Sequence, residues 1–418
     1  MTNYIILVLC LLILLAYLFD ITSKYSKVPG VILLIGLGIV LRLLVNNTGL
    51  EIPDIELLLP VIGTIGLILI VMEASMDLKL GKEKVGLIFK SATAAIILFA
   101  LFVAIMTFIF SRFLGYQLSE SLINAIPFGI ISSAVAIPSA INLNREQKEF
   151  VVYESSLSDI VGILVFDFVL LYQDAFLEGL ANYALKALLT VVVAIIVTSA
   201  LAILLHKITY HVSYIIILTS VILVYALAKM IHLPALLLVL AFGIALANYK
   251  LVQNTYIKKF VDFDEFGNDL ASFKKIMTEF TFVVRSFFFI MFGFYTNLEG
   301  LLNVNNIFTA LAIITGIYIL RIIFLWKFLK LPIFPFLFLS PRGLITILLF
   351  LSIPATLRIS PVNEEVVTLV ILLSIFLMMI GNIFYKKENI IAEESSTDII
   401  IHEECINDED CDDLEASD

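Results

Sequence analysis

The sequence predicts an all-α polytopic membrane protein with about 13 transmembrane helices. Of its 418 residues, 61% are hydrophobic and only 15% are charged, whereas a soluble domain is nearer one quarter charged. The apolar residues fall in long runs, and a run of about 18 or more residues is long enough to span a bilayer. Backbone amides in hydrocarbon must bond within the protein, so spanning segments form helices or a closed barrel. These runs are too long and too continuously apolar for barrel strands, which alternate over about ten residues.

The expected spans follow one another with mostly short connections. The first span starts near the N-terminus without a preceding basic residue or a small-residue cleavage site, so we expect a span and not a cleavable signal. The longest connection, from Lys250 to about Thr278, is charged and suits an amphipathic surface helix. The spans cover roughly residues 3–20, 28–46, 56–76, 85–112, 119–142, 150–173, 180–205, 209–230, 233–249, 277–298, 303–326, 331–355 and 363–385.

Basic residues are distributed unevenly between the breaks that separate the spans. Alternate breaks, starting after the first span, hold eighteen of the 26 Lys and Arg residues, and the other breaks hold five. Because basic loops stay in the cytoplasm, we expect an external N-terminus and a cytoplasmic C-terminus, in a bacterial inner membrane.

The C-terminal segment differs in composition from the rest of the chain. Residues 388–418 contain thirteen acids and no Lys or Arg, and without them the net charge of −10 becomes +3. Such a segment buries too little apolar surface to fold alone. We therefore expect a transmembrane domain at 1–387 and an acidic, disordered cytoplasmic tail at 388–418.

Three pairs of segments resemble each other at a common separation of seven spans. The second span contains VPGVILLIGLGIVL and the ninth LPALLLVLAFGIALAN; the third ends in MEASMDL and the tenth in MFGFYTNL; the fifth contains SSAVAIPSA and the twelfth SPRGLIT. Because seven is odd, the partners cross the membrane in opposite directions, as in transporters built from inverted repeats. We predict two inverted six-helix repeats, about 1–175 and 208–387, joined by a linking helix at 180–205.

Prolines stand within clusters of small or hydroxyl residues in the fifth and twelfth spans. Pro138 and Pro341 are therefore predicted to break these two crossing helices. Broken helices expose helix ends and free carbonyls at mid-membrane, where transporters place their ion sites. The alternative is a pair of ordinary proline kinks packed by their neighbours.

The sixth span, FVVYESSLSDIVGILVFDFVL, contains Glu154, Asp159 and Asp167. A charge near the bilayer centre costs about 2.5–3.5 kcal/mol or more, so such residues are functional candidates. Asp159 lies toward the middle, one turn after Ser155 and next to Ser158. Carboxylate and hydroxyl oxygens suit an alkali cation, and a desolvated carboxylate holds its proton more tightly. Asp159 is predicted to bind a proton or a monovalent cation, a competition that couples antiport; the alternative is a structural ion pair with a buried arginine.

The remaining charges inside spans are expected to be structural or to border this site. Arg342 is predicted to pair with Glu154, and Arg285 to stabilise freed carbonyls or helix ends. Asp167 is expected to be a hydrogen-bonded group near the outer end, and Glu73 is either a wall of the site or a simple cap. Either arginine alternatively lines an anion path.

Four motifs, in order, give the chain a family resemblance over nearly all of residues 1–386. They are MEASMDLKL (72–80), ESSLSDIVGI (154–163), RSFFFIMFG (285–293) and PRGLITILL (341–349). With them the chain resembles the monovalent cation:proton antiporter superfamily, most closely its sodium/proton exchanger branch. The resemblance implies thirteen helices, a homodimer, and an ion-binding bundle that moves like an elevator. It also implies that Asp159 is the shared carboxylate, with a contribution from Ser155, and that Glu154 pairs with Arg342.

Two departures from the exchanger pattern bear on ion selectivity. Ser158 precedes the essential aspartate, where the branch usually has Asn. The fifth span has Ala136-Ile137-Pro138 in place of Thr-Asp-Pro, and the Ser-Ser-Ala run at 132–134 resembles the potassium-efflux branch. The expected cation- and proton-binding set is Asp159, Ser155, Ser158, Glu73, Ala136 and Ser133, with Asp159 as the cation ligand.

The sequence therefore predicts an antiporter, not an enzyme, that exchanges Na⁺ or K⁺ for H⁺, electroneutrally because one carboxylate serves both ions. We expect no cofactor other than these ions, and as partners only membrane lipid and a second copy. The sequence lacks the HExxH and GxSxG motifs of enzymes and a nucleic-acid-binding surface. A channel or uniporter without proton coupling is the alternative function, and a regulatory protein without transport the next.

Overall fold

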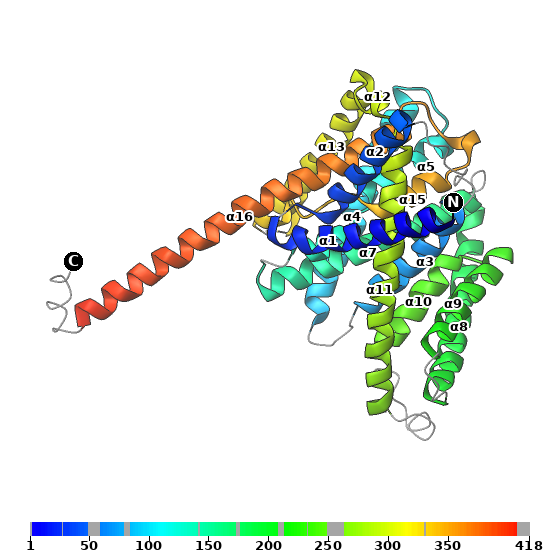
Figure 1. Cartoon of the computed structure of the whole chain (residues 1–418), viewed down its shortest axis with the longest axis horizontal. Helices are drawn as coiled ribbons and strands as arrows, with labels where there is room; N and C mark the ends of the chain where they lie inside the picture. The colour runs from blue at the N-terminus through cyan, green and yellow to red at the C-terminus, as the bar shows by residue number, and fades with distance from the viewer. Residues whose placement is uncertain are drawn as a thin grey trace.

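The computed structural model describes residues 2–26, 28–48, 59–78, 84–140, 143–172, 176–207, 213–231, 233–248, 263–329 and 332–407. In these ranges the chain forms helices joined by turns (Figure 1). The N-terminal half contains α1 (Thr2–Ser26), α2 (Gly30–Thr48), α3 (Leu59–Met76), α4 (Val85–Arg112), α5 (Leu118–Gly129), α6 (Ser133–Ser139), α7 (Arg145–Leu171) and α8 (Phe176–Lys207). The C-terminal half contains α9 (Ser213–Met230), α10 (Ala235–Ala247), α11 (Phe263–Tyr295), α12 (Leu298–Leu301), α13 (Val304–Phe324), the π-helical turn η4 (Leu325–Leu329), α14 (Ile333–Phe336), α15 (Leu344–Ser352), the 3₁₀ turn η5 (Ala355–Leu357) and α16 (Glu364–Asn407).

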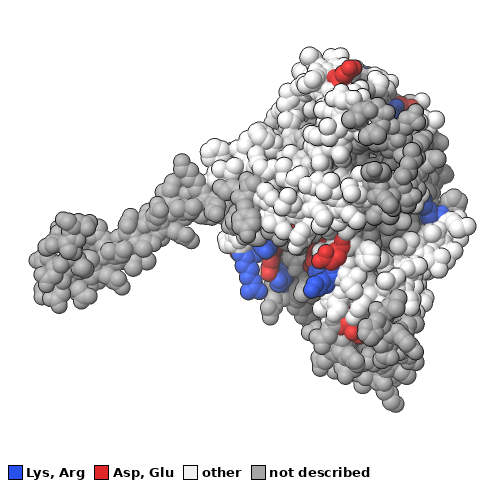
Figure 2. Space-filling view, viewed as in Figure 1, with Lys and Arg blue, Asp and Glu red and all other residues white. Residues whose placement is uncertain are grey.

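Each predicted span coincides with a helix or with a pair of short helices, as expected for an all-α membrane protein. Among the described residues, seven helices are long and apolar enough to cross a membrane, and four shorter apolar helices accompany them. The fifth span is the pair α5–α6, and the twelfth is the pair α14–α15. Large apolar side chains such as Leu14, Phe108 and Ile196 lie on the outer surface, where hydrocarbon surrounds a membrane protein. Figure 2 shows a mostly uncharged body on which the visible charges gather largely in one band.

Two segments differ from the sequence-based expectation. The charged segment before the tenth span is no separate surface helix, because α11 runs continuously from Phe263 to Tyr295; residues 249–262 lie outside the described range. Residues 388–407, expected to be disordered, continue α16 as helix. Glu, which is frequent there, favours helix without tertiary packing. In Figure 1, α16 extends away from the helical body.

The first break in the crossing helices lies upstream of its predicted position. The backbone is extended at Ile130 and Ser132 (ψ 131° and 111°), whereas Pro138 lies inside α6. The prediction that Pro138 breaks the helix is therefore wrong by one helical turn or more. Pro138 is the penultimate residue of a short helix, so its missing amide hydrogen interrupts little. Pro341 lies in the non-helical segment that precedes α15, between the two short helices of the twelfth span.

Two helix pairs are formed by segments that resemble one another in sequence. The second span, α2, packs along the tenth, α11, and the ninth span, α10, packs along the third, α3. Gly38 and Gly243 hold equivalent positions in the repeat. A Cβ on Gly38 would overlap the carbonyl oxygen of Ile290, and one on Gly243 would overlap the Ser75 hydroxyl. The repeated glycine thus permits close helix approach in both places.

Each of these two pairs also contains a polar contact near the C-terminal end of one helix. Arg42 of α2 donates to the carbonyl oxygens of Tyr295 and Thr296 at the end of α11, both at 2.9 Å. Asn248, which follows α10, donates to the Leu78 carbonyl at the end of α3, at 2.8 Å. A side chain from one helix of each pair thus satisfies terminal carbonyls of the other.

The helices form two groups that pack mainly within themselves. One group comprises α1, α2, α3, α8, α9, α10 and α11, and the other comprises α4, α5, α6, α7, α13, α14, α15 and α16. The groups meet where α3 contacts α6, α7 and α15, and where α10 contacts α7. This interface holds the candidate site.

Candidate functional site

The extended segment between α5 and α6 directs three consecutive backbone amides at other elements. The amide of Ile131 donates to Ser158 Oγ (3.0 Å), and the amide of Ser133 donates to Asp159 Oδ2 (3.2 Å). The amide of Ser132, between them, donates to the carbonyl oxygen of Pro341 (2.9 Å). Inside a continuous helix, these three amides would donate to carbonyl oxygens of the same helix. The break therefore frees amides that bind α7 and the second break.

The two breaks touch each other directly. Besides the bond from Ser132 to Pro341, a Cβ added to Gly343 would overlap the Ser132 hydroxyl. Only a residue without a side chain fits at this crossing. The N-termini of α6 and α15 thereby lie side by side, beside the polar face of α7.

Asp159 is almost completely buried, with 3% of its surface exposed. Its Oδ2 accepts the Ser133 amide, while its Oδ1 has no hydrogen-bond partner in the protein. Among the described residues, no Lys, Arg or His forms an ion pair with it. A buried carboxylate without a compensating charge is costly, so this side chain requires a proton or a cation.

A cavity of about 10 Å³ adjoins Asp159 at the interface of the two helix groups. Its walls come from α3, α7, α10 and α15 and include Ser75, Ser156 and Ile345. The Ser156 hydroxyl has no partner in the protein. A space of this size accommodates about one water-sized species. The site thus combines an incompletely bonded carboxylate with room for one small ion or molecule.

Glu154, one and a half turns before Asp159, is paired with a base that was not predicted. Arg321 of α13 donates through Nη1 to Oε1 and through Nη2 to Oε2, both at 2.8 Å. Both side chains are at most 2% exposed. The predicted pairing of Glu154 with Arg342 is therefore wrong. The sequence did contain a sign of this partner, because Arg321 is a basic residue within the eleventh span, as Arg285 and Arg342 are in the tenth and twelfth.

Arg342 instead binds carbonyl oxygens exposed by the two breaks. Its Nε donates to Phe128 O near the end of α5 (2.6 Å), and its Nη1 donates to Ser340 O (2.8 Å). Its position at the second break places its guanidinium against the first, which explains why it does not reach Glu154 as a partner. Arg342 thus has the role of stabilising helix ends that the sequence assigned to Arg285.

The structure shows no contact between Asp159 and several other predicted site residues. The Ser155 hydroxyl donates to Val151 O (2.7 Å), not to Asp159. Ala136 is fully buried and contributes only a methyl group. Glu73 lies within electrostatic range of Arg285 and next to Thr278, so it faces α11 and is absent from the Asp159 cavity. Asp167 lies near Lys229 of α9.

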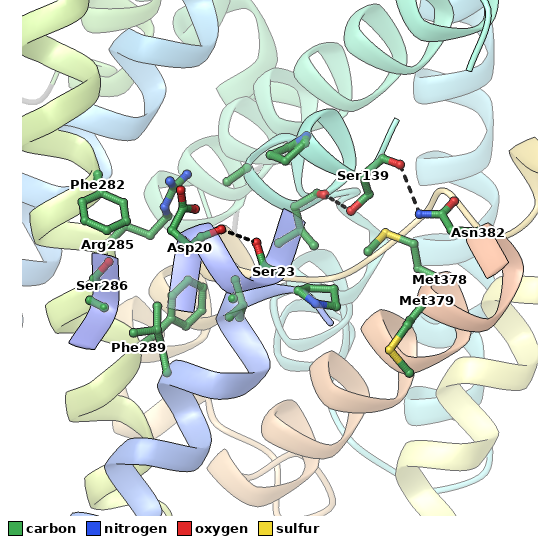
Figure 3. Close-up of a pocket in the computed structure, with 18 residues that line it drawn as sticks. Asp20, Ser23, Ser139, Phe282, Arg285, Ser286, Phe289, Met378, Met379 and Asn382 are labelled. Atoms are coloured by element: carbon green, nitrogen blue, oxygen red, sulfur yellow. Dashed lines mark hydrogen bonds between the residues drawn. The ribbon is translucent and has the colours of Figure 1, made fainter. Parts of the chain in front are cut away.

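A second, larger cavity opens between the helix groups. Its volume is about 280 Å³, and its walls come from α1, α2, α6, α11 and α16. Figure 3 shows Asp20 and Arg285 on one side of it and Ser139 with Asn382 on the other. It also reaches Ala134, the neighbour of Ser133. A roomy, partly polar cavity therefore ends one residue from the amide that binds Asp159.

Comparisons with known proteins agree with this architecture. A family model described as "Sodium/hydrogen exchanger, transmembrane" matches residues 10–384. The chain is similar to the structure of the sodium proton antiporter MjNhaP1 from Methanocaldococcus jannaschii at pH 8, with 18% identity and a TM-score of 0.64; the match covers 91% of this chain and 98% of that one. A structure of the same antiporter from electron microscopy gives 17% identity, a TM-score of 0.64, and coverages of 92% and 95%. No curated protein matches the chain significantly.

The two kinds of match carry different weight. At 17–18% identity, the structural likeness establishes the fold alone. The family model covers nearly the whole membrane region, including Glu154, Asp159 and both helix breaks. On that match, this chain belongs to the sodium/hydrogen exchanger family.

Proposed function

We propose that this protein exchanges a monovalent cation, Na⁺ or K⁺, for H⁺ across a membrane, with Asp159 as the site that both ions share. The family to which the chain belongs supports this proposal, as does the description of its structural relative as a sodium proton antiporter. Hard oxygen ligands suit an alkali cation.

The contrast between two carboxylates on α7 carries the proposal. Glu154 is neutralised permanently by the bidentate contact with Arg321. Asp159 is equally buried, but the neighbouring donors that the structure shows are only the amide and the hydroxyl of Ser133, and neither carries a charge. A proton neutralises such a carboxylate, and so does a desolvated cation, but the two cannot be bound together. Competition for one carboxylate makes the release of one ion a condition for binding the other.

One shared carboxylate gives one proton per cation. Asp159 is then neutralised in both loaded states, so the exchange is electroneutral. The Glu154–Arg321 pair adds no net charge, and Arg342 keeps its charge throughout the cycle. The expected transport rate at fixed ion gradients is therefore independent of membrane potential.

Alternating access follows from movement between the two helix groups. Asp159 lies at their interface, on a helix of the group that also contains both breaks. An elevator-like displacement of that group would carry the site from one side to the other. The apolar stretch Gly179–Thr198 of α8, of which only 11% is buried, then faces lipid or a second copy in a homodimer.

The test uses purified protein in liposomes that contain a pH-sensitive dye. After a proton gradient is imposed, Na⁺, K⁺ or Li⁺ is added to wild type, Asp159→Asn and Asp167→Asn. We expect cation-driven dissipation in wild type, its loss in Asp159→Asn, and its retention in Asp167→Asn, which removes another acid from the same helix. The apparent KM for the cation should rise up to about tenfold per unit decrease in pH, because the proton competes for the site.

The other possible outcomes would change the proposed function or the proposed site. Cation flux that persists without a proton gradient would favour the channel or uniporter alternative. Dissipation that survives Asp159→Asn would place the shared site elsewhere. No dissipation with any of the three cations would overturn the antiporter proposal.

A further inference from the structure

Arg342 is a buried arginine whose side chain bonds to no carboxylate in the described part of the chain. It is 3% exposed, and its side-chain hydrogen bonds, from Nε to Phe128 O and from Nη1 to Ser340 O, end on carbonyl oxygens. Among the described residues, no acceptor lies within hydrogen-bond distance of its Nη2. A guanidinium has five N–H donors and stays charged in proteins, so this side chain still requires an acceptor and a compensating negative charge.

The acidic residues near Arg342 do not supply that charge. Glu154 lies within electrostatic range, but both of its oxygens bind Arg321, which lies within the same range and repels Arg342. The two charges of this pair therefore largely cancel. The third titratable group within range is the phenol of Tyr318, which is uncharged near neutral pH. No electrostatic contact joins Arg342 with Asp159 in the described structure.

A cavity of about 20 Å³ adjoins Arg342 inside the helix group that contains both breaks. Its apolar walls come mainly from α4 and α13. Its polar lining comes from α7, α13 and the second break, and consists of Ser158, Arg321, Ser340 and Arg342. About 10–15 Å³ of such volume holds one water-sized sphere. The cavity therefore has room for one species slightly larger than water.

The polar lining of this cavity offers hydrogen-bond donors and a positive charge. Arg342 brings the N–H groups of Nη2, and Ser158 brings a hydroxyl whose oxygen already accepts the Ile131 amide. The hydrogen of that hydroxyl has no acceptor among the described residues, and no described Asp or Glu lines the cavity. Such a lining favours an anion over a water molecule, because water also needs acceptors for its own hydrogens.

We propose that this cavity binds a small monovalent anion, such as chloride, as a resident counter-ion of Arg342. The ion neutralises the guanidinium at the place where the two breaks, α7 and α13 meet. Because every lining residue belongs to one helix group, the ion stays with that group and is not transported. The inference goes beyond the proposed exchange and does not depend on it.

The first test is thermal unfolding of the purified protein in detergent, with choline as the only added cation. Choline chloride, bromide or gluconate is varied at constant ionic strength, so only the anion changes. We expect the melting temperature to rise to a plateau with chloride or bromide, because a ligand of the folded state stabilises it. Gluconate is too large for the cavity and should give no saturable rise. A melting temperature that does not depend on halide would overturn the inference and leave water as the occupant.

Two neighbouring alanines of α4 provide a matched pair of variants. Ala95 lines the cavity, whereas Ala94, which is also buried, does not. Ala95→Val adds two methyl groups to the wall and should raise the apparent Kd for chloride about tenfold or more, because overpacking opposes binding. Ala94→Val should change that Kd by no more than about twofold. Equal halide effects in the two variants would overturn the inference.

Removal of the charge is the complementary test. Arg342→Gln should abolish the halide-dependent rise in melting temperature, because the variant has no charge to neutralise. A rise of unchanged size in Arg342→Gln would overturn the inference. The comparison of Ala95→Val with Ala94→Val remains decisive if Arg342→Gln does not fold.

Bromide also locates the ion directly. Crystals grown with bromide should show an anomalous diffraction peak beside Arg342 and Ser158, and Ala95→Val should weaken or remove it. Peaks confined to the protein surface would indicate an adventitious ion only and would overturn the inference. None of these measurements uses transport, so a failure of the proposed exchange would be recognised separately.

Discussion

Arg321 and Glu154 form a bidentate, fully buried ion pair between α13 and α7, with two parallel N–H···O contacts of 2.8 Å. The third nitrogen of the guanidinium, Nε, donates to Phe336 O at 2.8 Å. Planar guanidinium and carboxylate groups match in this geometry. The pair therefore holds the charge of Glu154 in place, while Asp159, five residues later, has no basic partner among the residues that the structure describes.

The first prediction concerns the removal of either partner of this pair. Arg321→Met leaves a buried carboxylate uncompensated and should destabilise the protein by about 3–5 kcal/mol. Glu154→Gln should also destabilise the protein, because it leaves the buried charge of Arg321 uncompensated. The check is thermal unfolding of the purified protein in detergent. The double variant Glu154→Gln/Arg321→Met should recover much of the loss; additive losses in the double variant would contradict the pairing.

The second prediction concerns stabilisation by the transported ion. At a cation concentration ten times its Kd, wild type should gain about 1.4 kcal/mol of stability at a pH where Asp159 is ionised. Asp159→Asn removes the carboxylate and should abolish this gain without itself lowering the melting temperature, because an uncompensated buried charge is also removed. Thermal unfolding with Na⁺, K⁺ or choline measures both effects. An equal cation-dependent shift in the variant would argue against binding at Asp159.

The third prediction separates two neighbouring serines on α7. The Ser158 hydroxyl accepts the Ile131 amide of the broken helix, so Ser158→Ala leaves a buried donor unsatisfied at a cost of about 1–3 kcal/mol. The Ser155 hydroxyl donates to a carbonyl oxygen of its own helix, so Ser155→Ala should change the stability of the protein little. Melting temperatures and exchange rates of the two variants test this difference. A larger effect from Ser155→Ala would instead support the direct role that the family resemblance implies.

The fourth prediction uses two glycines of α2. A Cβ at position 38 would overlap the Ile290 carbonyl and lie 2.7 Å from the Phe294 amide nitrogen, whereas one at position 36 meets nothing within 4 Å. Gly38→Ala should therefore separate α2 from α11 and destabilise the fold by about 1–3 kcal/mol or more. Gly36→Ala should be neutral or slightly stabilising, because alanine favours helix. Yield of monodisperse protein and thermal unfolding distinguish the two.

Sequence reasoning located the helices well, and it placed Asp159 inside a span, where the side chain is buried, because both depend on local composition. Apolar runs fix where a helix lies in a membrane, and an acid in the middle of such a run is conspicuous. It failed for the partner of Glu154, because the choice between Arg321 and Arg342 depends on how α13 packs beside α7. It also misplaced the first break, because Pro138 is a local signal whereas the extended segment at 130–132 is stabilised by Ser158, Asp159 and Pro341, all distant in the chain.

The pairing of α2 with α11, and of α3 with α10, has a consequence for how the chain is made. Each repeat supplies the surface on which the other packs, so the two halves are interleaved and not stacked. During synthesis, α2 enters the membrane more than two hundred residues before its partner α11 exists. The groove beside Gly38 must then stay unfilled or be covered by lipid until the second half arrives. Part of the first half is thus inserted before its packing partners exist, and completion of α11 is the step at which α2 acquires its final neighbour.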